Sequence, residues 1–264
     1  MKNLSLMNRK MLNTAFNTFK ELTRNKILYL ILFFWVLLIG FSLVLASLSL
    51  WQTEKIISDF GLAMIEIFWL VSVIFIWSQL LFKEIEGKTI YLILSKPISR
   101  YEFILWKFLG FAMILFLIIF FQSIIFFLLA IYSDIQISWI LFASIVFIYL
   151  KLIVLFAIIL FFSTFISSIL SIVLTILVYV ISHSVTSIMD MAARSNNTIM
   201  YYLWKILYVV FPNFESLNIK SLVSSYQKFD IMYTLWNWIY ALIYLLLLLI
   251  FTVLIFNRKT FENS

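Results

Sequence analysis

Residues 83–107 read KEIEGKTIYLILSKPISRYEFILWK and contain five of the chain's basic residues. A hydrophobic run long enough to cross a bilayer as a helix lies on each side of this stretch. A charged stretch between two such runs lies in water at a membrane face, because charges are costly in hydrocarbon. The sequence therefore predicts a membrane protein in which residues 83–107 form an aqueous loop.

The composition excludes the other common classes of protein. The chain is 65% hydrophobic and has only four Gly and two Pro, whereas a soluble domain is about half apolar and disordered chains are poor in apolar residues. The net charge of +7 does not predict a nucleic-acid partner, since most basic residues flank the hydrophobic runs. The chain has no Cys, which excludes disulfides and thiol chemistry.

Six runs are long and apolar enough to span a membrane, which needs about 20 residues each. They are residues 27–50, 62–82, 108–132, 138–162, 169–189 and 236–256. Barrel strands are shorter and alternate polar with apolar residues. We therefore predict an all-α, polytopic membrane protein with six transmembrane helices within 27–256. The first run is expected to stay in the mature protein, because residues 1–26 are too polar and too long for a cleavable signal peptide.

The basic residues predict the orientation of the six runs. Segments 1–26, 83–107 and 257–264 carry 13 Lys or Arg, whereas the segments on the other side carry five. By the positive-inside rule, both termini and the 83–107 loop lie in the cytoplasm. Residues 257–264 then form a cytoplasmic tail.

The segment before the first run is amphipathic. Its apolar residues recur every three or four positions: Leu4, Met7, Met11, Ala15, Phe19 and Leu22. This periodicity predicts a helix over residues 1–26 that lies on the cytoplasmic headgroups. The alternative is a basic flank that only orients the first run.

The outer segment 190–235 is too long for a simple connection. Its middle, 199–211, is apolar but too short to cross, so we predict an interfacial or re-entrant helix that ends before Pro212. This helix either caps a pathway or packs over the outer ends of the spans.

The cytoplasmic loop contains a break between two predicted helices. Pro97 prevents a smooth continuation of the helix before it, and Ser99 with Glu102 predicts a capping box at the start of the third span. A short helix around 85–95, apolar on one side and charged on the other, is suited to a groove on a partner. The alternative is a solvated hairpin without a partner.

The loop is not an ATP site, although Gly87-Lys88-Thr89 ends like a Walker A motif. That motif needs Gly at position 82, which is Phe here, and it follows a strand, whereas a predicted membrane helix precedes this stretch.

The sequence EGKTI at 86–90, LSKPISR at 94–100, Phe103 and KFLG at 107–110 resemble the ABC-2 type permeases. In that family a Glu, a later Thr and a Pro-x-x-Arg mark this loop, and the branch most similar includes the permease of nitrous-oxide reductase and multi-copper enzyme maturation. The resemblance in motif covers about 25 residues. The resemblance in topology covers nearly the whole chain and extends to STFISS at 163–168 and PNFE at 212–215.

The resemblance implies the permease subunit of an exporting ABC transporter in a bacterial plasma (inner) membrane. Two copies of this chain, or this chain and a sibling, would join two separate ATPase subunits that hold ATP and Mg. The chain itself would then be neither an enzyme nor a cofactor carrier. The helix around 85–95 would be a coupling helix, with Glu86, Thr89, Pro97 and Arg100 as ATPase-coupling residues by motif position.

Two polar residues lie deep in the predicted spans. Lys151 is near the middle of the fourth run, where a charge costs roughly 3 kcal/mol and indicates a function by default. Gln122 is at a similar depth in the third run, and both are candidates for a substrate path. In the alternative, the lysine stem packs and its ammonium meets a backbone carbonyl. Glu66 is predicted too near the outer end of its run to pair with Lys151.

The fifth run ends in a polar face. Ser182, Thr186 and Asp190 follow a four-residue step, which predicts helix packing or a dimer seam. His183 is the only histidine, and one His without Cys or a carboxylate cluster predicts no metal site.

Two other classes of function remain as alternatives. A secondary transporter or channel would use Lys151 and Gln122 without an ATPase, but the paired broken helices typical of such transporters are absent from the sequence. An intramembrane enzyme would need a catalytic motif such as His-Glu-x-x-His, which the sequence lacks. The bulky spans argue against a wide hydrophilic pore and leave a lipid, an apolar peptide or drug, or a sulfur or copper species as the cargo.

Overall fold

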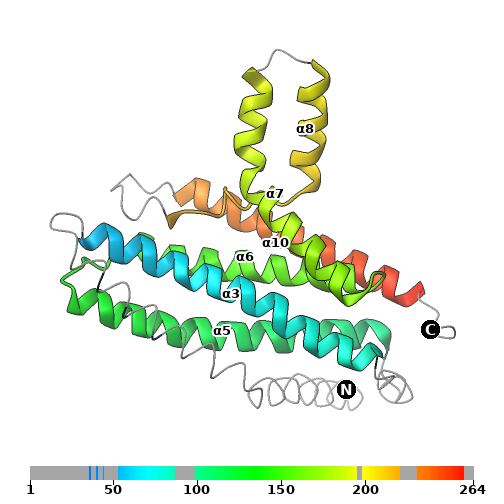
Figure 1. Cartoon of the computed structure of the whole chain (residues 1–264), viewed down its shortest axis with the longest axis horizontal. Helices are drawn as coiled ribbons and strands as arrows, with labels where there is room; N and C mark the ends of the chain where they lie inside the picture. The colour runs from blue at the N-terminus through cyan, green and yellow to red at the C-terminus, as the bar shows by residue number, and fades with distance from the viewer. Residues whose placement is uncertain are drawn as a thin grey trace.

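The structure, a computed structural model, describes residues 53–86, 99–194, 198–220 and 231–258, together with 36, 40 and 44. These residues form helices and loops without a strand. The helices are α3 (Thr53–Glu86), α5 (Arg100–Tyr132), α6 (Trp139–Ser163), α7 (Ser168–Arg194), α8 (Thr198–Val210) and α10 (Ile231–Arg258) (Figure 1).

Five of the described helices are long and apolar enough to cross a membrane: α3, α5, α6, α7 and α10. They contain the second to sixth predicted runs, so the all-helical, multi-span prediction is confirmed for this part of the chain. Most of the first run, the helix at 1–26, most of the tail and the loop at 87–98 lie outside the described residues.

Four of the five helices, all except α6, are longer than the apolar runs they contain. α3 begins at Thr53 instead of 62, α5 begins at Arg100 instead of 108, and α10 begins at Ile231 and extends to Arg258. The helical backbone therefore continues into polar sequence, where intrahelical hydrogen bonds do not depend on apolar side chains.

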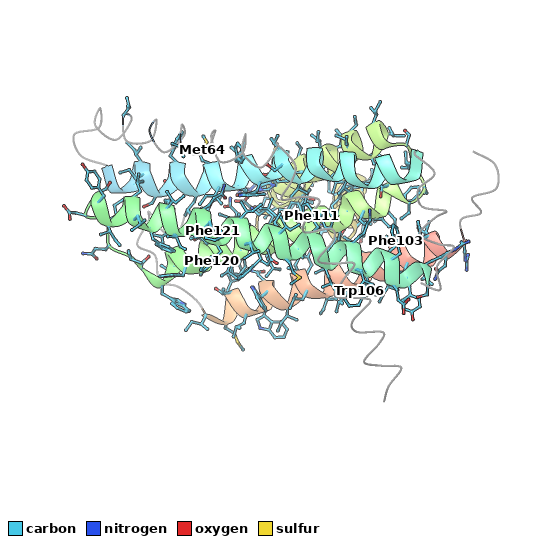
Figure 2. The ribbon with its side chains drawn as sticks, turned by 90° about the horizontal axis from the view of Figure 1, so that it is seen from below. Met64, Phe103, Trp106, Phe111, Phe120 and Phe121 are labelled. Atoms are coloured by element: carbon cyan, nitrogen blue, oxygen red, sulfur yellow. The ribbon has the colours of Figure 1, made fainter. Side chains whose placement is uncertain are left out.

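α6 is the central helix of the bundle. It packs against α3, α5, α7 and α10, and every residue from 150 to 160 is buried. A helix that is hydrophobic on all sides is buried by its neighbours. Phe156 of α6 stacks on Phe111 of α5 at 3.8 Å between ring centroids. Figure 2 shows Phe111 between Phe121 and Phe103 along α5.

The outer surface of the bundle is apolar, as a lipid-facing surface requires. On α5, Phe121 and Leu128 are 58% and 60% exposed. Phe121 carries one of the labels along α5 in Figure 2.

α7 and α8 form a hairpin that leaves the bundle. Figure 1 shows the second part of α7 and all of α8 standing away from the other helices. The helix predicted at 199–211 is confirmed as α8, which packs on α7 and contains no buried residue. It does not lie over the outer ends of the spans.

The segment 211–220, which follows α8, returns into the bundle. Phe214, Leu217 and Ile219 are 0–3% exposed and belong to the main hydrophobic core. The Phe214 amide donates to the carbonyl of Ser182 at 3.1 Å. Ser182 lies 14 residues after the start of α7, or about 21 Å along its axis, so the segment reaches deep between the helices.

Asn213 holds the turn at which this segment enters. Its Oδ1 accepts from the amide of Ser216 at 3.1 Å and from Thr186 Oγ1 at 3.2 Å. Its own amide donates to the hydroxyl of Tyr240 at 3.0 Å. The turn is therefore tied to both α7 and α10.

The start of α5 is fixed to the end of α10. The Ser99 amide donates to Glu102 Oε2 at 2.9 Å, which confirms this half of the predicted capping box. Phe103 stacks on Phe256 of α10 at 6.2 Å. These contacts place the start of α5 beside the end of α10.

Candidate functional site

The structure brings five polar side chains together inside the bundle, and we call this cluster the polar centre. They are Glu66 on α3, Lys151 on α6, Tyr179 and His183 on α7, and Lys220 on the 211–220 segment. Lys151 and Glu66 are 1% and 2% exposed, whereas Lys220 and His183 are 20% and 24% exposed.

Glu66 is the hub of the polar centre, because both of its carboxylate oxygens are occupied. Lys151 Nζ donates to Oε1 at 2.8 Å, and the Tyr179 hydroxyl donates to the same oxygen at 3.2 Å. The ammonium of Lys220 pairs with Oε2. One carboxylate thus binds groups from three separate parts of the chain.

The pairing of Glu66 with Lys151 corrects the sequence analysis, which placed Glu66 too near the outer face. Helix α3 begins at Thr53, so Glu66 lies 13 residues, or about 20 Å, into the helix. Lys151 lies 12 residues, or about 18 Å, into α6. Both helices begin at the same end of the bundle (Figure 1), so the two side chains lie at the same depth.

The His183 ring lies against both members of the Glu66–Lys151 pair. Its Nε2 lies 3.2 Å from Lys151 Nζ, and its Nδ1 lies 3.3 Å from the carbonyl of Tyr179. Its Nε2 also lies 3.5 Å from Glu66 Oε1. The ring packs against Tyr179 and Phe214, with centroids 4.4 and 5.7 Å away.

The polar centre is costly to build and costly to break. Buried ion pairs lose hydration that their attraction only partly restores, and removing one partner typically costs 3–5 kcal/mol. Ionisable residues inside a membrane mark pathways or switching elements by default. Within the described residues, no group of three His, Cys, Asp or Glu side chains is placed to hold a metal ion.

Gln122, the other residue predicted for a substrate path, has a different partner from Lys151. Its side chain is 0% exposed, and its Oε1 accepts from the indole of Trp69 on α3. Its Nε2 is buried without a hydrogen-bond partner. Trp69 lies three residues after Glu66, so this second polar contact is one helical turn from the polar centre.

Two of the four predicted coupling residues, Glu86 and Arg100, lie at the end of the bundle where α3 stops and α5 begins. Glu86 is the last residue of α3, and Arg100 is the first of α5. Thr89 and Pro97 lie outside the described residues. Arg100 Nη1 donates to the carbonyl of Asn257 at 3.1 Å, so this cation also sits at the C-terminal end of α10, where helix dipoles favour positive charge.

Sequence reasoning missed Glu66, Tyr179 and Lys220 as members of the site. A signal for Glu66 was present: one carboxylate and one lysine in otherwise apolar runs predict a pair. Lys220 was harder to find, since its position depends on the re-entry of an outer segment.

Comparison with protein families gives a match. A family model described as ABC-2 family transporter protein matches residues 43–261, which include all six described helices and the polar centre. A search of curated proteins gives no significant match.

Proposed function

The chain belongs to the ABC-2 family of transporter proteins, and from this premise we propose that it is the permease subunit of an ABC transporter. A separate ATPase subunit, present in two copies, binds ATP and Mg and hydrolyses the nucleotide. The permease converts that cycle into export of its cargo. The family match over residues 43–261 carries the proposal, and the bundle of apolar helices supports it.

The cytoplasmic loop at 87–98 is the contact with the ATPase. It is flanked by Glu86 and Arg100, which end α3 and begin α5. Because Arg100 is bonded to the end of α10, a push on the loop reaches α3, α5 and α10 together. In this arrangement both termini are cytoplasmic and the membrane is the bacterial plasma membrane.

The polar centre is the element that the nucleotide cycle rearranges. Lys220, like His183, is partly exposed, and it belongs to a segment that has entered the bundle from the outer side. When the 211–220 segment withdraws from the bundle, Glu66 loses its contact with Lys220 and keeps its contact with Lys151. A conformational switch requires a packed element with two discrete arrangements. The 211–220 segment, inserted into the bundle or withdrawn from it, provides such an element.

A purified complex tests the coupling proposal. ATP turnover by the ATPase subunit is measured alone, with the permease, and with Glu86→Gln or Arg100→Gln permease. Both variants are expected to lower the stimulation of turnover while the protein stays in the membrane. Arg194→Gln is the matched control, because Arg194 ends α7 away from the loop. If both loop variants stimulated turnover normally, the loop would not be the coupling site.

A second permease copy completes the transporter. The α7–α8 hairpin supports this proposal, since α8 has no buried residue and Ile199 and Ile206 are 75% and 61% exposed. The chain has no Cys, so Ile206→Cys can be crosslinked without background. Crosslinked dimers are expected for Ile206→Cys and not for Leu128→Cys on α5. Equal crosslinking at both positions would argue against a hairpin-mediated dimer.

A secondary transporter is the second candidate, and the buried ionisable residues of the polar centre favour it. The two functions differ in their energy source. Cargo movement that requires ATP and the partner subunit supports an ABC transporter. Movement driven by an ion gradient in the permease alone supports a secondary transporter. Screening apolar and amphipathic compounds for stimulation of ATP turnover identifies the cargo class.

A further inference from the structure

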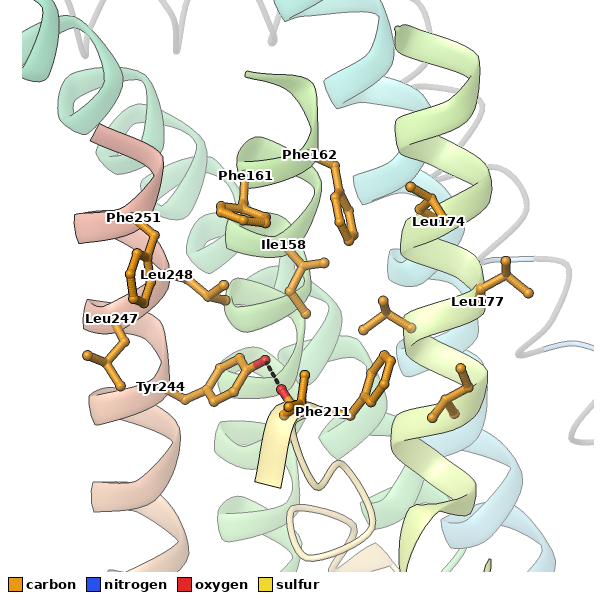
Figure 3. A pocket seen from close by; sticks show the side chains of 13 residues that line it. Ile158, Phe161, Phe162, Leu174, Leu177, Phe211, Tyr244, Leu247, Leu248 and Phe251 are labelled. Atoms are coloured by element: carbon orange, nitrogen blue, oxygen red, sulfur yellow. Dashed lines mark hydrogen bonds between the residues drawn. The ribbon is translucent and has the colours of Figure 1, made fainter. Parts of the chain in front are cut away.

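A cleft lies between α7 and α10, on the side of α7 away from the polar centre. Both helices pack on α6, whose side chains Ile158, Phe161 and Phe162 form the floor of the cleft (Figure 3). Its volume is about 540 Å³, within the usual range for a small-molecule site. Val210 and Phe211 close one end.

The lining of the cleft is almost wholly hydrocarbon. Among its 13 lining residues the one polar side chain is Tyr244. The Tyr244 hydroxyl already donates to the carbonyl of Val210 at 3.1 Å, as the dashed line in Figure 3 shows. A bound water needs two to four polar partners, and this lining does not offer them. The occupant of the cleft is therefore apolar.

The cleft lies around the middle of the bilayer. On α7 it extends from Leu174 to Ile181, or about 9 to 20 Å from the start of the helix. One leaflet contributes about 15 Å of the hydrocarbon core. The cleft therefore begins in the leaflet on the side where α10 ends and reaches past the bilayer centre. That leaflet is cytoplasmic in the orientation predicted from the basic residues.

The cleft is open toward the lipid. Leu177 on one rim and Leu247 and Phe251 on the other are 50%, 49% and 52% exposed. A hydrocarbon chain in the bilayer therefore reaches the cleft from the side.

A cation lies on the same face of α10 as the cleft. Tyr244, Leu247, Phe251, Leu254 and Arg258 follow alternating steps of three and four residues, which places them on one helical face. Arg258 is exposed and ends the helix seven residues, or about 10 Å, beyond Phe251. This position suits the phosphate of a lipid whose chain fills the cleft.

We propose that the α7–α10 cleft binds an acyl chain of a phospholipid from the adjacent leaflet, with the lipid phosphate beside Arg258. The site is independent of ATP coupling and would exist in the permease alone.

Photolabelling of the full chain in vesicles tests this site. The probe is phosphatidylglycerol with a diazirine in one acyl chain, and labelled peptides are identified by mass spectrometry. Labels are expected at 174–181 and 244–251, in excess over the lipid-facing Leu109 and Met113 of α5. Uniform labelling of all lipid-facing surfaces would overturn the proposal.

Filling the cleft with a Trp side chain distinguishes a lipid bound in the cleft from lipids that exchange freely at the protein surface. Leu177→Trp is expected to abolish the excess labelling of α10, and Leu247→Trp that of α7. Val180→Trp is the matched control, since Val180 is 55% exposed on the same helix and does not line the cleft. A melting curve for each variant shows that it is folded. Unchanged labelling in both folded cleft variants would overturn the proposal.

The contact between the lipid phosphate and Arg258 is tested separately. Arg258→Gln is expected to weaken phosphatidylglycerol labelling about fivefold, the change typical of one basic residue near a membrane. Labelling by a diazirine diacylglycerol, which lacks phosphate, should not respond to this substitution. Equal responses of the two probes would remove Arg258 from the site. Normal ATP stimulation with cleft labelling lost leaves the proposed transport function intact.

Discussion

Lys220 contacts Glu66 across 154 residues of sequence, and this ion pair joins an outer segment to the interior of the second predicted span. The same carboxylate pairs with Lys151 of the central helix. The stability of the bundle and the position of the 211–220 segment thus depend on one side chain.

Loss of the carboxylate should destabilise the chain strongly. Glu66→Gln leaves Lys151 charged and buried, so the free energy of unfolding in detergent should fall by about 3–5 kcal/mol. Glu215→Gln is the control, because Glu215 is an exposed carboxylate on the 211–220 segment. It should change stability by less than about 0.5 kcal/mol. Similar losses in both variants would contradict a buried hub.

Removing both charges together should cost less than the sum of the single changes. In Glu66→Gln with Lys151→Met, neither side chain is a buried unpaired ion. A double-mutant cycle on the free energy of unfolding should give a coupling energy of about 1–3 kcal/mol. Additive losses would mean that the two residues do not interact directly.

Lys220→Met should loosen the 211–220 segment without unfolding the bundle. The lost contact to a charged group should lower the free energy of local opening by about 1.5–3 kcal/mol. Hydrogen exchange should accelerate at the amides of 211–220 and remain slow in α6. Lys205→Met on α8 is the control, since its ammonium lies over Tyr201, away from the segment. Faster exchange in α6 as well would show that the segment is not an independent unit.

Gly61 is required by the close approach of α3 to α5. A Cβ atom at this position would overlap the ring of Phe126, so Gly61→Ala should cost about 1–3 kcal/mol through overpacking. Gly40→Ala is the control, because nothing lies within 4 Å of its Cβ position. Combining Gly61→Ala with Phe126→Leu should recover part of the loss in thermal stability. If thermal stability does not recover, the loss in Gly61→Ala comes from the backbone and not from overlap with Phe126.

The number and type of the spans from the second to the sixth could be predicted, because long apolar runs leave few structural options in a bilayer. Their starting points could not. The sequence TEKIISDFG at 53–61 is too polar for a hydropathy criterion, yet it continues α3. That error moved Glu66 toward the membrane surface and concealed its partner.

Lys151 was recognised as a candidate, but the polar centre around it was not. The burial of Phe214 and Ile219 depends on the positions of α7 and α10 in the bundle. The apolar character of these two residues does not by itself place them in the core. Gln122 was also recognised, and the structure assigns it to Trp69 because helical register, not depth alone, decides which side chains meet.

The burial of α6 has a consequence for biogenesis. A ribosome delivers Glu66 to the bilayer 85 residues before Lys151, so a counter-ion is already in place when the lysine leaves the translocon. Without it, the lysine would enter hydrocarbon at a cost of roughly 3 kcal/mol. Lys220 is synthesised last of the three, and its arrival completes the ion pairs of Glu66.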